Sequence, residues 1–261
     1  FRDHMAESGL EKPTLSIEET TEEDEKFGVV GALAQLVERE GLDGEDLLVV
    51  AGDNLISFGL SDFLDDFDEH GTTTIAAYDV GSYDRASAYG VVELDDERVV
   101  EFQEKPEDPK STLVSIACYA FPADAVRFEE YLEDGNNPDE PGWFVQWLVD
   151  NEAVHAFPFE EAWFDIGTPE SYLDAVAWEL DGESIIAESA TVESSTIGEN
   201  VHILPGAEVV DSTIDQSIIF PDSIIRDCEL RASIIDQDTH VENLDLAGAL
   251  IGAHTHIANG H

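Results

Sequence analysis

The C-terminal third of the sequence is built on a short repeat. From about residue 184 onward, single aliphatic residues recur every five or six positions, separated by small or polar residues. These aliphatic residues are Ile186, Val192, Ile197, Ile203, Val209, Ile214, Ile219, Ile225, Leu230, Ile235, Val241, Leu246, Ile251 and Ile257. A hexapeptide period predicts a left-handed parallel β-helix of four or five turns, in which each face of a coil contributes one inward aliphatic. The alternative, a stack of ordinary short strands, does not require so regular a spacing.

Residues before this repeat alternate between helical and strand patterns. Apolar residues at helical spacing predict helices over 29–40 and 60–70, each followed by a glycine. Strands are expected at 47–51, 72–78 and 115–121, a hairpin at 88–104, and further helices near 2–12, 123–134, 143–151 and 169–180. The wholly apolar run 47–51 indicates a strand buried on both faces. This alternation predicts an α/β domain with a mostly parallel sheet over 1–181, followed by the β-helix over 182–261.

The charge balance narrows the choice of partners. The chain has 60 Asp and Glu against 11 Lys and Arg, a formal net charge of −49, yet 43% of its residues are hydrophobic, which indicates a folded protein. Self-repulsion of this size is tolerated where salt screens it, so we expect a salt-rich cytoplasm. Binding of a basic partner is the weaker alternative. Nucleic acid is disfavoured because no basic patch could neutralise its phosphates.

Cysteine usage and hydropathy point to the same compartment. Cys118 and Cys228 lie in different segments, so the sequence indicates neither a cysteine metal cluster nor a disulfide framework. No apolar run approaches the roughly 18 residues of a membrane span, and no signal peptide precedes the chain. We therefore expect a soluble cytoplasmic protein with no membrane partner.

Two aspartates follow apolar segments in a way that suits metal binding. Asp53 comes directly after the run 47–51 and Gly52, and Asp165 follows Trp163 and Phe164. Ligands bind at the carboxyl ends of strands in α/β sheets, and two carboxylates suffice for Mg²⁺ when substrate phosphates complete its coordination. An aspartate after a strand is also often a helix cap, so this pattern alone leaves both interpretations open.

Five motifs in order resemble the sugar-phosphate nucleotidyltransferase family. They are GDN at 52–54, YGVVEL at 89–94, EFQEKP at 101–106, CYAF at 118–121 and WFDIGTPESYLDA at 163–175. The chain is most similar to the glucose-1-phosphate thymidylyltransferase and uridylyltransferase group, whose archaeal members often carry a hexapeptide-repeat tail. The resemblance implies a Rossmann-like nucleotidyltransferase domain and an enzyme that forms an NDP-sugar, dTDP- or UDP-glucose, and pyrophosphate from dTTP or UTP and a sugar-1-phosphate.

The resemblance also implies a role for each matching residue. Asp53 and Asp165 would coordinate Mg²⁺. Gly90 would contact the sugar, Glu104 would accept hydrogen bonds from its hydroxyls, and Lys105 would hold the sugar-1-phosphate. Gly28 matches a family glycine that lies against the nucleotide base, although Val29 and Val30 stand where the family has Thr-Ala.

One family feature has no counterpart here. The family opens with a GGxGTRLxP loop that holds the triphosphate through backbone N–H groups and brings an arginine. The 261 residues contain no such loop and begin with Phe1. We expect the N-terminal part of the domain to be missing and this chain to be inactive in nucleotide transfer.

Two other functions stay open. The chain could be a non-catalytic subunit that binds sugar nucleotide, forming a homo-oligomer through its β-helix. Hexapeptide-repeat acyltransferases use a histidine in the repeat. Because this repeat region also contains histidines, acyl transfer stays open as the weakest of the alternative functions. These histidines are His202, His240, His254 and His256.

Overall fold

The computed structural model describes residues 14–17 and 27–259, so the helix expected at 2–12 lies outside the described residues. The chain divides into two compact units. The sheet unit comprises Phe1–Ala51 and Phe58–Glu161, and the solenoid unit comprises Gly52–Ser57 and Ala162–His261. In the part of the chain that the structure describes, no helix has the length and apolar character needed to cross a bilayer.

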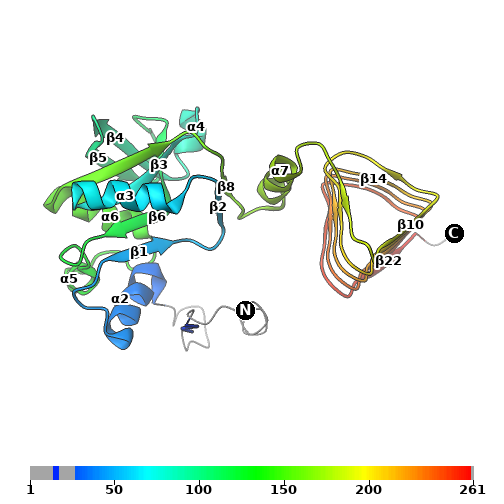
Figure 1. The fold of residues 1–261 in the computed structure, drawn as a ribbon, viewed down its shortest axis with the longest axis horizontal. Helices are drawn as coiled ribbons and strands as arrows, with labels where there is room; N and C mark the ends of the chain where they lie inside the picture. Colours follow the sequence, from blue (N-terminus) through cyan, green and yellow to red (C-terminus); the bar gives the residue numbers. More distant parts are fainter. Residues whose placement is uncertain (1–13, 18–26, 260–261) are drawn as a thin grey trace. The chain divides into compact units, whose positions relative to one another are not determined.

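Six strands form the sheet of the sheet unit, in the order β1-β6-β3-β7-β5-β4 (Figure 1). They are β1 (Leu47–Val50), β3 (Thr73–Asp79), β4 (Gly90–Asp95), β5 (Arg98–Glu104), β6 (Leu113–Phe121) and β7 (Val154–Phe159). The predicted hairpin at 88–104 is confirmed as the antiparallel pair β4–β5. Asp96, in the turn between them, adopts a positive φ of 55°.

The prediction of a mostly parallel sheet is wrong for these strands. β6 lies between β1 and β3 and runs antiparallel to both, β5 runs antiparallel to β4 and β7, and β3–β7 is the parallel pair. Alternating helices and strands indicate layers, but a strand's direction depends on the neighbour with which it pairs. The prediction for 47–51 is also wrong, because Leu48 and Val50 are each 40% exposed on the edge strand β1.

Helices cover both faces of this sheet (Figure 1). They are α2 (Gly28–Glu40), α3 (Leu60–His70), α4 (Tyr83–Ala86), α5 (Phe128–Glu133) and α6 (Pro141–Asn151). In β7, Ala156 joins the core formed with α2, α5 and α6, whereas Phe157, on the other face, packs edge-on against Phe63 of α3. The helices predicted at 29–40 and 60–70 are confirmed, and Gly41 and Gly71 end them in the left-handed conformation. α5 is shorter than the predicted 123–134.

The solenoid unit begins with a two-stranded ribbon and a helix. β2 (Asn54–Ile56) pairs antiparallel with β8 (Trp163–Asp165). Helix α7 (Pro169–Leu180) follows, where a helix was predicted. Thr168 caps it by accepting from the backbone N–H of Ser171, while the Ser171 side chain accepts from the backbone N–H of Thr168. The ribbon was not predicted, since strands of three residues carry too little pattern to detect.

The predicted parallel β-helix is confirmed as a parallel β-solenoid of about five turns. Its strands are β9 (Ile185–Ile186), β10 (Thr191–Glu193), β11 (Thr196–Ile197), β12 (His202–Ile203), β13 (Glu208–Val210), β14 (Thr213–Asp215), β15 (Ile218–Ile219), β16 (Ile224–Arg226), β17 (Glu229–Arg231), β18 (Ile234–Ile235), β19 (His240–Glu242), β20 (Asp245–Ala247), β21 (Leu250–Ile251) and β22 (His256–Ala258). They form three parallel sheets, one on each side of a triangular coil (Figure 1). Along each sheet the predicted aliphatics stack on one another, as Ile203, Ile219 and Ile235 do.

Buried hydroxyl groups tie neighbouring coils together. Ser217, Ser223 and Ser233 are fully buried. The Ser217 hydroxyl donates to the backbone carbonyl of Asp215 and accepts from the backbone N–H of Ser233, 16 residues ahead. Each hydroxyl therefore satisfies backbone groups that the turn leaves unpaired, which is how a polar side chain is accommodated inside an aliphatic core.

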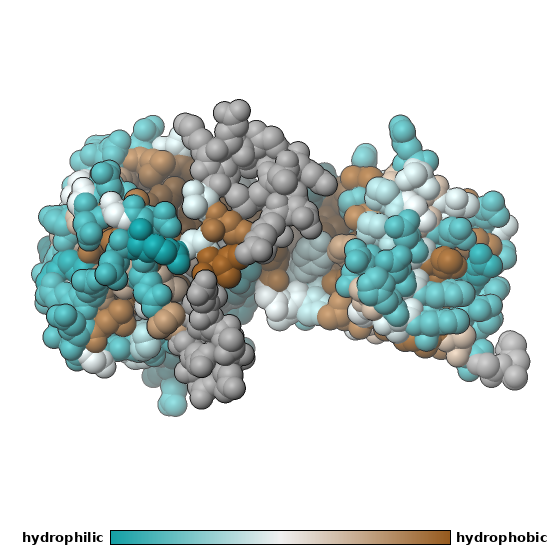
Figure 2. Space-filling model, turned by 90° about the horizontal axis from the view of Figure 1, so that it is seen from below, coloured by the Kyte–Doolittle hydropathy of each residue, from teal (hydrophilic) through white to brown (hydrophobic). Residues whose placement is uncertain are grey.

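The charge of the chain is carried on its surface. Figure 2 shows hydrophilic residues over most of the visible surface of each unit. The described residues with fully buried side chains are apolar or carry hydroxyl groups. The acidic composition is thus compatible with ordinary cores, since the carboxylates remain hydrated.

Candidate functional site

Lys105 sits at a strained turn at the end of β5. Its φ is 44°, in the left-handed region that non-glycine residues rarely adopt. The backbone N–H of Lys105 donates to the carbonyl of Tyr89 at 3.0 Å, and Pro106 follows at once. A lysine held in such a conformation is typical of a functional position, because a glycine would adopt it without strain.

The neighbouring carboxyl group of Glu104 occupies a space bounded by two glycines. Gly90 lies opposite Glu104 in the β4–β5 ladder, and a Cβ on Gly90 would stand 3.0 Å from Glu104 Oε2. A Cβ on Gly142, in the first turn of α6, would stand 1.7 Å from the same oxygen. The backbone N–H of Glu104 donates to Gln146 Oε1 of α6 at 3.2 Å. The two glycines thus leave room for the Glu104 side chain against α6.

Burial changes the acidity of this carboxyl group. Desolvation raises the pKa of Glu104 to about 7, and Glu140 adds to the rise while Lys105 opposes it. The Lys105 ammonium pairs with Glu140 Oε1 at 2.5 Å, and that hydrogen bond raises the pKa of Lys105. We call Glu104, Lys105 and Glu140 the lysine cluster below. In this cluster the Lys105 side chain carries a positive charge, and the Glu104 carboxyl group takes up a proton more readily than an exposed glutamate does.

Gly28 has a packing role of its own. Its φ is 73°, and a Cβ there would stand 2.3 Å from the carbonyl oxygen of Pro138. The same loop caps α2, since the N–H groups of Val29 and Val30 donate to the carbonyls of Asp139 and Pro138. Close approach of two backbones explains this glycine. Its role at a nucleotide base stays a prediction.

The ribbon brings Asp53 and Asp165 together. Asn54 lies directly opposite Asp165 in the β2–β8 pair, and the N–H of Ile166 donates to the carbonyl of Asp53 at 2.9 Å. Asp53 is exposed and Asp165 is half-buried. Asp53 precedes a strand and caps no helix, which removes the capping interpretation of this residue.

Asn54 orients Asp53, a role that the sequence alone did not predict. Its side-chain oxygen accepts from the indole N–H of Trp163 at 2.7 Å, and its amide donates to Asp53 Oδ1 at 2.9 Å. The carboxylate of Asp53 is thereby held beside the strand that carries Asp165. One exposed carboxylate just before β2 and one half-buried carboxylate in β8 fit Mg²⁺, which takes one or two protein carboxylates and completes its shell with water and phosphate oxygens.

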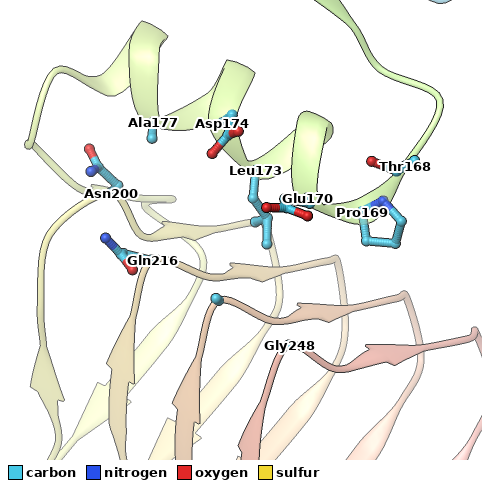
Figure 3. Close-up of a pocket in the computed structure, with 10 residues that line it drawn as sticks. Thr168, Pro169, Glu170, Leu173, Asp174, Ala177, Asn200, Gln216 and Gly248 are labelled. Carbon is cyan, nitrogen blue, oxygen red and sulfur yellow. The ribbon is translucent and has the colours of Figure 1, made fainter. Parts of the chain in front are cut away.

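The solenoid unit also holds a cavity of about 570 Å³ beneath α7 (Figure 3). Four equivalent corners of successive coils line it, all with positive φ: Asn200, Gln216, Ala232 and Gly248. Leu173 extends from α7 toward these corners. Five of its lining residues belong to the motif at 163–175, namely Thr168, Pro169, Glu170, Leu173 and Asp174, but none of the residues with an expected role in binding or catalysis lines it.

The remaining predicted residues behave as follows. Cys118 is buried, and desolvation raises its pKa to about 12, as expected of an inert core thiol. His240 and His256 stack with ring centroids 4.5 Å apart as partners on neighbouring coils. His254 lies 3.4 Å from Asp238. These histidines thus occupy ordinary positions along the solenoid.

Residues 2–181 match the family model of nucleotidyl transferases, so the chain belongs to that family. Curated relatives carry the name glucose-1-phosphate adenylyltransferase. The protein from Thermosipho africanus is 34% identical over 50% of this chain and 33% of its own length. Those from Thermosipho melanesiensis and Bacillus mycoides are 27% and 29% identical over 69% and 67% of this chain. The latter two alignments cover 49% and 52% of the relatives, so the chain spans about half their length.

Proposed function

We propose that this chain carries the sugar-phosphate and metal sites of an enzyme that joins a sugar-1-phosphate to a nucleotide. The observation that carries the proposal is the lysine cluster, with Lys105 in a strained turn beside a carboxyl group that two glycines accommodate. In a chain of net charge −49, a phosphate ester is repelled almost everywhere. Lys105, beside a sugar-binding carboxylate, supplies the missing attraction when the phosphate replaces Glu140 as its partner.

The proposed reaction is an in-line attack of a sugar-1-phosphate oxygen on the α-phosphorus of a nucleoside triphosphate, with pyrophosphate as the leaving group. Lys105 binds and orients the attacking phosphate, and Glu104 in its ionised form accepts hydrogen bonds from sugar hydroxyls. Asp53 and Asp165 would hold Mg²⁺, with Asn54 fixing the orientation of Asp53. When bound, Mg²⁺ neutralises phosphate charge.

Glucose-1-phosphate is the sugar phosphate we propose. The motifs favour dTTP or UTP as the nucleotide, and the names of the relatives add ATP. We further propose that the chain works in a salt-rich cytoplasm and associates through its solenoid, where Ile185 and Ile186 are each more than two-fifths exposed.

Because the 261 residues contain no GxGTR loop, we expect this chain to bind glucose-1-phosphate without transferring a nucleotide. Titration calorimetry in molar salt tests binding. Lys105→Ala should weaken it by at least tenfold, which corresponds to about 1.4 kcal/mol. Lys110→Ala is the matched control, since Lys110 also pairs with a surface carboxylate, Glu101.

Three outcomes are informative. Equal effects of the two lysine substitutions, or no binding by the wild-type chain, contradict the proposed role of Lys105. Formation of a sugar nucleotide from ATP, dTTP or UTP contradicts the predicted inactivity while supporting the site.

Asp53→Asn and Asp165→Asn should each reduce the effect of Mg²⁺ on binding and leave Mg²⁺-free binding unchanged.

A further inference from the structure

Two histidines and a glutamate meet in the sheet unit, on the face of the sheet that α3 covers. His70 is the last residue of α3, Glu97 lies in the turn between β4 and β5, and His155 is in β7. The backbone holds the last two in place, because the N–H of Ala156 donates to the carbonyl of Glu97 at 2.8 Å. None of the three residues belongs to the lysine cluster or the aspartate pair.

The potential ligand atoms of these residues converge. One nitrogen from each imidazole and one carboxylate oxygen lie within 4.8 Å of one another. Glu97 Oε2 is 3.5 Å from Nε2 of His155 and 4.0 Å from Nε2 of His70. Ligand atoms around a tetrahedral metal with bonds of about 2.0–2.1 Å stand about 3.3 Å apart. The rings of His70 and His155 are stacked with centroids 3.5 Å apart and 22° between their planes. Because a metal lies in the plane of each imidazole that binds it, metal binding requires the rings to turn so that both Nε2 atoms point to one ion, besides a shift of less than about 1 Å in these oxygen–nitrogen distances.

The hydrogen bonding of His70 favours the tautomer that binds metal. Its Nδ1 lies 2.9 Å from the backbone carbonyl of Asp66, which can only accept. Nδ1 is therefore the protonated nitrogen in the neutral ring. Nε2, which faces Glu97, then carries the lone pair that can bind a metal. A backbone carbonyl that fixes the second nitrogen is typical of metal-binding histidines.

The charges around the cluster also leave room for a cation. Asp66 and Glu97 both face the two rings, and the ion pairs described for these carboxylates are with His70 and His155 alone. The Oδ2 atom of Asp66 is buried without a hydrogen-bond partner among the described residues. With neutral imidazoles, two carboxylates carry two negative charges, which a divalent cation would balance.

We propose that His70, Glu97 and His155 form a binding site for a divalent transition metal, with Asp66 as a positioning residue. Two imidazoles and one carboxylate are the ligand set of zinc sites that keep a fourth position for water. Imidazole selects zinc, cobalt, nickel or copper over magnesium, which prefers oxygen ligands. Bound there, the metal joins the end of α3, the β4–β5 turn and β7, and so stabilises the sheet unit. The site is independent of the proposed function.

Cobalt(II) is the probe that tests this site, because its visible absorption depends on its ligands. Co²⁺ held by imidazoles absorbs strongly, whereas Co²⁺ held by carboxylates and water in an octahedral shell absorbs weakly. The 261-residue chain is titrated with Co²⁺ in molar salt containing excess Mg²⁺, which occupies the many surface carboxylates. We expect the intense absorption to saturate at one Co²⁺ ion per chain and to disappear when Zn²⁺ displaces the bound Co²⁺. Zinc should also raise the melting temperature, since a ligand that binds only the folded state stabilises it.

Substitutions locate the site. His155→Gln and His70→Gln should each weaken Co²⁺ binding at least tenfold. Asp66→Asn should weaken it less than either histidine substitution, because it removes the carboxylate charge 3.6 Å from His70 Nδ1 but keeps the backbone carbonyl that fixes this nitrogen. His254→Gln is the matched control, because His254 also faces a carboxylate, Asp238, but in the solenoid. Circular dichroism confirms that each variant is folded, and Glu97→Gln, in an exposed turn, provides a variant with little risk to folding.

A weak carboxylate-type spectrum from the wild-type chain contradicts the proposal, as does an intense spectrum that survives both histidine substitutions. In either case the cluster would be a set of histidine–carboxylate contacts that holds the three elements together without metal. Loss of the spectrum in the three ligand variants with retention in His254→Gln would establish the site.

Discussion

The solenoid and the sheet unit bury their apolar side chains in different ways. In the solenoid, each buried aliphatic packs on its equivalent one coil away, as Ile219 does on Ile203 and Ile235. In the sheet unit, aromatic rings from distant segments meet, and Phe144 contacts Phe121, Phe128 and Tyr131. The first kind of core repeats one local environment, whereas the second is assembled once from many.

This difference affects where function can reside. A repeated environment offers the same surroundings to every coil, so a single reactive side chain is hard to single out there. The sheet unit brings unique combinations together, such as Glu104 between Gly90 and Gly142. The lysine cluster and the group of His70, Glu97 and His155 both depend on such contacts between segments far apart in the sequence.

The largest effect is expected in the solenoid core. Ile219 is fully buried in the middle of its sheet, whereas Ile186 of the same sheet is 45% exposed at the first coil. Ile219→Ala should lower the free energy of unfolding by about 3 kcal/mol, because it removes methyl groups and leaves a cavity. Ile186→Ala should cost less than about 1 kcal/mol. Both losses of unfolding free energy are measured by denaturation followed with circular dichroism. Equal losses in the two variants would contradict the expectation that aliphatic residues of the middle coils contribute more to stability than those of the end coils.

A comparable test in the sheet unit uses a glycine. Gly142→Ala should destabilise the protein by about 1 kcal/mol at most, since the new Cβ displaces the Glu104 carboxyl group, which is the flexible end of a side chain. Helix propensity alone predicts the opposite sign for this helical position. Gly252→Ala is the control, because open space surrounds Gly252. In a Glu104→Ala background the cost of Gly142→Ala should disappear, and a cost that persists would place the overlap elsewhere.

The pH dependence of stability tests the burial of Glu104. A carboxyl group whose folded pKa is raised to about 7 binds more protons in the folded state between pH 4.5 and 7, so its contribution to stability falls as pH rises through that window. Glu104→Gln should therefore stabilise the protein at pH 8 by on the order of 1 kcal/mol, a value discounted for solvent access, and have little effect at pH 4.5. A pH-independent difference between the two proteins would show that Glu104 is not responsible.

The smallest effect concerns the corners of the solenoid. Ala232 has a φ of 45°, and Gly248 occupies the equivalent corner one coil later with a φ of 63°. Ala232→Gly should stabilise the protein by about 0.5–1 kcal/mol by removing backbone strain, and Gly248→Ala should cost a similar amount. Both are measured as shifts in the midpoint of denaturation. Two shifts of the same sign would contradict strain at this corner.

Sequence-based prediction succeeded for the repeated solenoid and for single helices, and was less successful for the strands of the sheet unit and the ribbon. The aliphatics of the repeat were assigned correctly because each lies in a strand whose partner is one coil away. Helices α2 and α3 were found from their apolar stripes and terminal glycines. Strands β2 and β7 were missed, since β2 has three residues and Pro158 interrupts the pattern of β7. The strand end expected before Asp165 is β8, but its pairing with β2 was not predicted.

Within the candidate site, motifs identified Asp53, Asp165 and Lys105 but not the residues that position them. Asn54, Gly142 and Glu140 act through contacts with segments far away in the chain. The glycine beside Pro141 at a helix start was the one local signal for Gly142, and it does not indicate which side chain requires the space. Nothing in the local pattern associates His70 with His155, which are stacked with ring centroids 3.5 Å apart.

The sequence by itself determined the solenoid, the main helices, the charge of the surface and the family, because these depend on period, composition and motif order. The tertiary structure decided the strand directions, the surroundings of Glu104 and Lys105, the orientation of Asp53 by Asn54, and the meeting of two histidines with Glu97. The physical reason is that local pattern sets which face of an element is buried. Pairing between distant segments sets which side chains come within a few ångströms of one another.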